Sequence, residues 1–162
     1  MAVGSASWSF TEDDFAAITQ ALQRFLDDAN ARCALLVDRS GQLVATVGEQ
    51  PRFDSTAFAT LTAADFSAND QLAKLIGERD FNSLFHQGEK ESMYLADVAR
   101  RLILVVLFDS RTTLGLVRLK MKQTVEELTK LFEQVFNRPP QEQGGAPGLL
   151  AGADDEIDKL FQ

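Results

Sequence analysis

The residue best suited to chemistry is the single histidine, His86, which has Asp80 and Glu89 nearby in the sequence. A zinc site normally gathers several Cys and His ligands at close spacing. This chain offers one histidine and one cysteine, Cys33, which lies in an apolar run and is expected to be inert core. A lone histidine also makes a Ser-His-Asp triad improbable. We therefore expect His86 to be structural, with no catalytic residue and no metal.

Other candidates for small-molecule chemistry are equally weak. Gly144 and Gly145 fall in a segment with no strand before it, whereas a phosphate-binding loop follows a strand. No cofactor is therefore expected. The net charge of −8, with basic residues scattered among acids, argues against nucleic acid or an anionic membrane as the main partner. A protein partner, a small ligand or both remain.

Targeting signals are not evident. The first five residues lack a basic segment followed by an apolar stretch, and no window approaches the roughly 20 apolar residues that span a membrane. We therefore expect a cytoplasmic protein with no membrane span.

The first elements that would position an interaction site are a helix and a hairpin. From Thr11, apolar residues recur at helical spacing as far as Ala29, with Thr11 or Ser9 as N-cap. Two apolar runs, residues 33–37 and 43–47, flank a short Asp/Ser/Gly turn, which is typical of a β-hairpin. The first run is apolar at every position, so both of its faces should be covered.

A second helix is expected to begin at Asp54 or Ser55 and to end at Gly77. Its apolar residues are Phe58, Leu61, Phe66, Leu72, Leu75 and Ile76. Its middle is unusual because several neighbouring side chains are small: Ala63, Ala64, Ser67, Ala68 and Asn69. Another chain can approach such a flank closely, although small residues also serve tight packing within one domain.

Short strands and a last helix complete the pattern. Residues 81–87 are ambiguous, 93–98 are plausibly extended, and 102–108 form a buried strand by their apolar and β-branched content. A long amphipathic helix follows from Thr113 to the residues before Pro139, although 114–120 alone would pass for a strand. The order is α-β-β-α-β-β-β-α. It predicts an α/β (α+β) fold, a three-layer sandwich with a five-stranded antiparallel sheet and helices on both faces.

The chain divides into a domain over residues 1–138, a flexible linker over 139–153 and a short amphipathic motif over 154–162. The motif places three apolar residues at i, i+3 and i+4: Ile157, Leu160 and Phe161. A single turn of this kind is not stable alone, so it indicates a peptide that docks in a groove.

Several stretches resemble the MglB branch of the roadblock family, whose fold is roadblock/profilin-like. They are Ala34–Leu43, Leu72–Glu78, His86–Glu89, Leu114–Lys120 and the acidic-apolar ending Asp155–Phe161. The resemblance extends from Phe10 to Phe161 and rests on the order and spacing of these stretches together.

The resemblance implies a homodimer that binds a Ras-like GTPase of the MglA type and accelerates GTP hydrolysis. It implies a regulator of cell polarity and gliding motility, located in the cytoplasm at a cell pole, with other polarity proteins as further partners. The C-terminal motif would add a nucleotide-exchange effect. Carried over by position, the GTPase-binding or dimer-groove residues are Thr62, Ala63, Ser67, Asp70 and Gln71.

Such a regulator is not an enzyme, because it has no active site of its own. Five arginines are formal candidates for a finger that neutralises the γ-phosphate: Arg52, Arg79, Arg100, Arg101 and Arg111. The resemblance instead implies that the partner's own catalytic residues are pushed into place. Two alternatives stay open. The first is a non-activating roadblock scaffold, favoured by Ala63-Ala64-Asp65 where relatives have a small Ala-Gly-Asn run and by Phe66 where a smaller residue is usual. The second is a PAS-like or GAF-like sensor with a polar cavity.

Overall fold

The computed structural model describes residues 9–138, so the expected linker and the motif of Ile157, Leu160 and Phe161 lie outside the described residues. The elements follow in the order α-β-β-α-β-β-β-α, as predicted. Their bounds are α1 (Glu12–Ala29), β1 (Cys33–Asp38), β2 (Leu43–Gly48), α2 (Ser55–Leu75), β3 (Ser83–Gln87), β4 (Ser92–Val98), β5 (Leu102–Phe108) and α3 (Leu114–Phe136).

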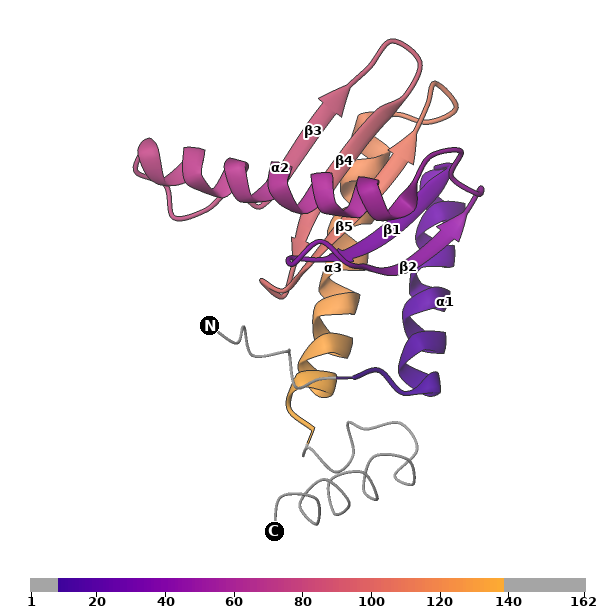
Figure 1. Cartoon of the computed structure of the whole chain (residues 1–162). Coiled ribbons are helices and arrows are strands. Elements are labelled where there is room, and N and C mark those ends of the chain that lie inside the picture. The colour runs from indigo at the N-terminus through magenta and orange to yellow at the C-terminus, as the bar shows by residue number, and fades with distance from the viewer. Residues whose placement is uncertain (1–8, 139–162) are drawn as a thin grey trace.

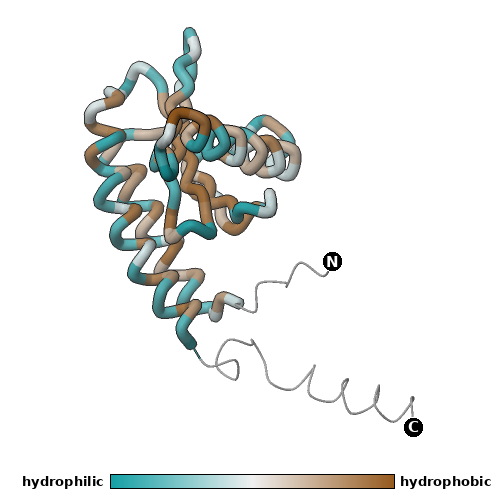
Figure 2. The backbone as a smooth tube through the Cα atoms, turned by 90° about the vertical axis from the view of Figure 1, so that its left-hand side faces the viewer, coloured by the Kyte–Doolittle hydropathy of each residue, from teal (hydrophilic) through white to brown (hydrophobic). Residues whose placement is uncertain are grey.

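The five strands form one antiparallel sheet in the order β2-β1-β5-β4-β3. Helices α1 and α3 cover one face and α2 crosses the other, which gives three layers (Figures 1 and 2). Strands β2 and β3 are the two edges. The predicted fold class is confirmed.

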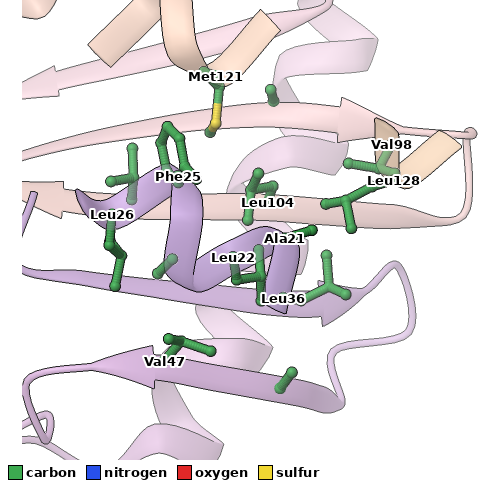
Figure 3. Close-up of a cluster of buried hydrophobic side chains, with 14 of the residues drawn as sticks. Ala21, Leu22, Phe25, Leu26, Leu36, Val47, Val98, Leu104, Met121 and Leu128 are labelled. Carbon is green, nitrogen blue, oxygen red and sulfur yellow. The ribbon is translucent and has the colours of Figure 1, made fainter. Parts of the chain in front are cut away.

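Strands β1 and β5 lie at the centre of the molecule and are buried along almost their whole length. Their apolar residues point to both layers in turn, because successive side chains of a strand alternate between faces. On the α1 and α3 side, Leu36 and Leu104 meet Leu22, Phe25 and Met121 from the helices (Figure 3). On the α2 side a smaller cluster includes Leu35, Ile103, Val105 and Phe66. The expectation of cover on both faces is confirmed.

Side-chain caps fix where the helices begin. Thr11, rather than Ser9, caps α1 and forms a capping box with Asp14. The Asp54 carboxylate accepts from the amides of Thr56 and Ala57 at 3.0 and 3.2 Å, so α2 begins at Ser55. Thr113 caps α3, and residues 114–120 are therefore helical. The ambiguous stretch before β4 becomes a strand only from Ser83.

The two ends of the described chain are joined by an ion pair between Asp14 and Arg138. Both terminal nitrogens of the Arg138 guanidinium donate to the Asp14 carboxylate at 2.6 Å. These hydrogen bonds are the largest cause of the lowered pKa of Asp14. A carboxyl group with a depressed folded-state pKa stabilises the fold above its unfolded pKa, and this contribution is lost as the pH falls through the folded value.

We expect Asp14→Asn to lower the free energy of unfolding at pH 7 by about 1–2 kcal/mol, because the charge-assisted pair is lost. The difference from the wild type should shrink as the pH falls toward and through the lowered pKa of Asp14. Urea unfolding at pH 7 and near pH 3 measures both values. Asp13→Asn, at an exposed neighbour in the same first turn, is the matched control. Equal losses for the two variants at pH 7 would contradict the pairing.

Candidate protein-interaction surface

The outward face of α2 carries large apolar side chains that water can reach. Leu61, Leu72, Leu75 and Ile76 are 68%, 58%, 82% and 70% exposed. Together with Ala68 they follow helical spacing and form one apolar stripe, here called the α2 stripe. Contiguous exposed apolar surface of this kind marks interaction sites in proteins.

The same helix is anchored to the sheet by a narrow inward face. Its buried residues are Ala59, Thr62, Phe66, Asn69 and Ala73. Of the large apolar residues that the sequence places on this helix, only Phe66 is fully buried and Phe58 is partly so. The four large residues of the α2 stripe remain outside because a single helix turns only one side to the sheet. The C-terminal half of α2 also extends past β3 at the sheet edge (Figure 1).

Strand β3 offers an unpaired backbone edge beside the α2 stripe. Within the described chain it pairs only with β4, so its other side has no strand partner. The His86 Nε2 lies 2.6 Å from an Asp65 carboxylate oxygen and ties this edge strand to α2. An exposed edge is a template for pairing with a strand from another chain.

The five residues expected from the resemblance lie on two sides of α2. Ser67 and Gln71 are exposed and Ala63 is half-buried, and their spacing places them on one flank. Thr62 is 4% exposed and faces the sheet. Asp70 is half-buried and accepts a hydrogen bond of 2.7 Å from Arg39. The structure therefore brings Ala63, Ser67 and Gln71 together, while Thr62 and Asp70 contact the interior of the same chain.

Arg39 is a positioning residue that the sequence did not reveal. Its guanidinium donates to Asp70 of α2 and to Asp97 of β4, and it lies 5.0 Å from the centroid of the Phe66 ring. One side chain from the β1–β2 turn thus holds the helix to the sheet. Phe66, an unusual residue for the resemblance, forms the floor under this cation. Its bulk is fully buried and does not alter the exposed flank.

We expect Arg39→Met to destabilise the protein by about 3 kcal/mol, because two partly buried carboxylates lose their cation. Arg52→Met is the matched control at an exposed arginine, and it should change stability by less than about 0.5 kcal/mol. Thermal or urea unfolding of both variants gives the comparison. If the two variants lost the same stability, Arg39 would not hold α2.

Chemical sites of other kinds are not evident in residues 9–138. No three His, Cys, Asp or Glu side chains of this range gather as metal ligands. None of its helices combines the length and the apolar content needed to cross a bilayer.

Comparison with known proteins identifies the architecture. The Roadblock/LC7 domain profile matches residues 17–108, more than half of the chain. The chain belongs to the Roadblock/LC7 family. Among solved structures, Myxococcus xanthus MglB is 48% identical, with a TM-score of 0.72 over 74% of this chain and 98% of that one.

Two further MglB structures agree with this assignment. The gliding protein MglB from Thermus thermophilus is 32% identical, with a TM-score of 0.74, and covers 80% of this chain and 98% of its own. An MglB described as having a tetrameric arrangement is 31% identical, with a TM-score of 0.75, and covers 81% and 98%. The chain is therefore an MglB-type roadblock protein, and the PAS-like and GAF-like alternatives do not apply.

Proposed function

We propose that this roadblock protein is a homodimer that binds a Ras-like GTPase of the MglA type and accelerates its GTP hydrolysis. The observation that carries the proposal is the exposed face of α2, where an apolar stripe runs beside a flank of small and polar residues. The likeness to MglB supports the choice of partner. A role in cell polarity and gliding motility at a cell pole, with other polarity proteins, belongs to the same proposal.

Two adjacent features support a dimer: the backbone edge of β3, unpaired within the described chain, and the exposed apolar α2 stripe. Pairing of β3 with β3 of a second copy would satisfy both backbone edges and continue the sheet. The same two-fold arrangement brings the overhanging half of each α2 over its partner, so that Leu61 and Leu72 are covered. An isologous contact of this kind closes on itself and stops at two copies.

The GTPase would then contact the flank of α2 that the dimer leaves free. Ser67 and Gln71 are exposed there and Ala63 lies between them and the sheet. Small side chains let the backbone of a partner approach closely. Thr62 and Asp70 would act indirectly, by holding α2 at a fixed distance from the sheet and at a fixed rotation about its own axis.

Three of the five candidate arginines have partners within the chain. Arg100 lies 3.7 Å from an Asp80 oxygen, Arg101 stacks 4.2 Å from the Phe136 ring centroid, and Arg111 is paired with Asp109. Arg52 and Arg79 are also exposed, so the conformational mechanism proposed here is supported by the resemblance to MglB rather than by elimination of the arginines. A protein that binds the hydrolysis-competent state of the GTPase more tightly raises the population of that state.

Affinity for the two nucleotide states tests this mechanism. Calorimetry with a Ras-like GTPase of the MglA type should give at least tenfold tighter binding to the GTP-analogue form than to the GDP form. Equal affinity for both forms would contradict selection of the active state. It would favour the second candidate, a scaffold that tethers GTPases or other roadblock proteins without activating them.

A further inference from the structure

The sheet face beneath α3 is only partly covered and leaves a groove. Residues of β4, of the segment around Ser83 and of α3 line this groove. The uncovered part lies over β4 and β3, next to α3. The groove there has a volume of about 730 Å³.

Apolar side chains make up most of the interior of this groove. Tyr94 and Ala96 of β4 form the floor, and Leu119, Met121 and Val125 of α3 form the wall. Leu119 is 54% exposed, whereas Met121, Tyr94 and Ala96 are buried, so Leu119 offers the main apolar surface that water reaches. An open apolar groove beside a helix suits the apolar side of a short amphipathic helix.

The rim of the groove is positively charged along one stretch of α3. Arg118 and Lys122 line it one helical turn apart, and the Arg118 guanidinium lies 5.8 Å from the Tyr94 ring centroid. Two acids also line the groove. Asp97 is already paired with Arg39, and Glu126 lies one turn beyond Lys122.

We propose that this groove holds the acidic-apolar segment 154–161 of its own chain. Ile157, Leu160 and Phe161 would share one side of a helical turn and enter the apolar interior. Asp154, Asp155, Glu156 and Asp158 carry the charge opposite to Arg118 and Lys122, and Lys159 carries the charge opposite to Glu126. The proposal goes beyond the GTPase function and does not depend on it.

The chain length permits this contact. Lys122 precedes Arg138 by 16 positions (138 − 122), which corresponds to about 24 Å along a helix. Residues 139–153 number 15, and a flexible chain of that length would have a root-mean-square span of about 20 Å and an extended reach of about 50 Å. The segment can therefore return along α3 without strain. When bound there, it would be withheld from any other partner.

A spin label at the end of the full-length chain tests the contact. Gln162→Cys gives a single labelling site, because Cys33 is buried and burial raises the pKa of its thiol to about 11, far from the reactive thiolate range. In the ¹⁵N-labelled protein, amides of Ser83, Tyr94 and residues 119–125 should lose most of their intensity through paramagnetic broadening. The loss should be smallest for amides of β2, at the opposite edge of the sheet from β3.

Charge reversal supplies the second arm of the test. Arg118→Glu with Lys122→Glu should abolish the broadening, whereas Lys90→Glu with Lys130→Glu, which makes the same change in net charge at other sites, should preserve it. Broadening that is absent in the parent chain, centred on α2, or insensitive to the Arg118 and Lys122 changes would overturn the proposal. Broadening that appears only between spin-labelled and ¹⁵N-labelled copies in a mixed sample would overturn it too, because the segment would then bind another molecule.

Discussion

Replacement of Leu61 and Leu72 by aspartate is expected to convert the proposed dimer into a 17.9 kDa monomer. Burial of a leucine side chain contributes about 1.5–3 kcal/mol, and a two-fold interface loses each of these contributions twice. The dimer dissociation constant should therefore rise at least about a thousandfold. Gel filtration with light scattering at micromolar concentration measures the mass directly.

The control for this variant uses exposed apolar residues outside α2. Phe15→Asp with Leu119→Asp introduces the same charge at side chains that are 48% and 54% exposed on α1 and α3. This control should keep the dimer mass. If both variants had the mass of a monomer, or both had the mass of a dimer, the α2 stripe would not be the interface.

The second large effect is expected at the flank of α2 that the dimer leaves free. Ser67→Arg with Gln71→Arg should reduce the stimulated rate of GTP hydrolysis at least about a hundredfold, because two long side chains would hold the GTPase away from the helix. A loss of that size corresponds to about 2.7 kcal/mol of transition-state stabilisation. The mass in solution should remain that of the dimer.

Its control makes the same two substitutions on another surface. Ser110→Arg with Gln123→Arg alters an exposed serine after β5 and an exposed glutamine of α3. Stimulation should be unchanged there. A similar loss in both variants would mean that added positive charge, rather than the α2 flank, disturbs the GTPase.

The order of elements was predictable because each element carries its own local signal. The run at 102–108 is apolar throughout and has the length of a strand, which favours a strand over a helix. Thr11 and Asp54 cap their helices through hydrogen bonds to backbone amides within four residues of each cap. Signals were weaker at 81–87 and 114–120. In the first the strand begins only at Ser83, and in the second the cap at Thr113 overrides the alternating pattern.

The interaction surface was only partly predictable for a physical reason. Helical spacing places Leu61 and Phe66 in the same apolar pattern, yet only the fold decides which of them the sheet covers. The Arg39 cluster was not predictable either, because Arg39 reaches Asp70 and Asp97 across 31 and 58 positions of sequence. The flank of small residues that contains Ala63 and Ser67 could be predicted from the sequence, because the size of a side chain follows from the residue type alone.

Phosphate release in a single turnover tests directly whether this protein accelerates GTP hydrolysis by its GTPase partner. A Ras-like GTPase of the MglA type, loaded with GTP, would be followed with and without a stoichiometric amount of this roadblock protein. We expect a rate increase of about tenfold or more, which corresponds to lowering the activation barrier by at least about 1.4 kcal/mol. Complex formation with an unchanged rate would contradict activation and leave the protein a scaffold.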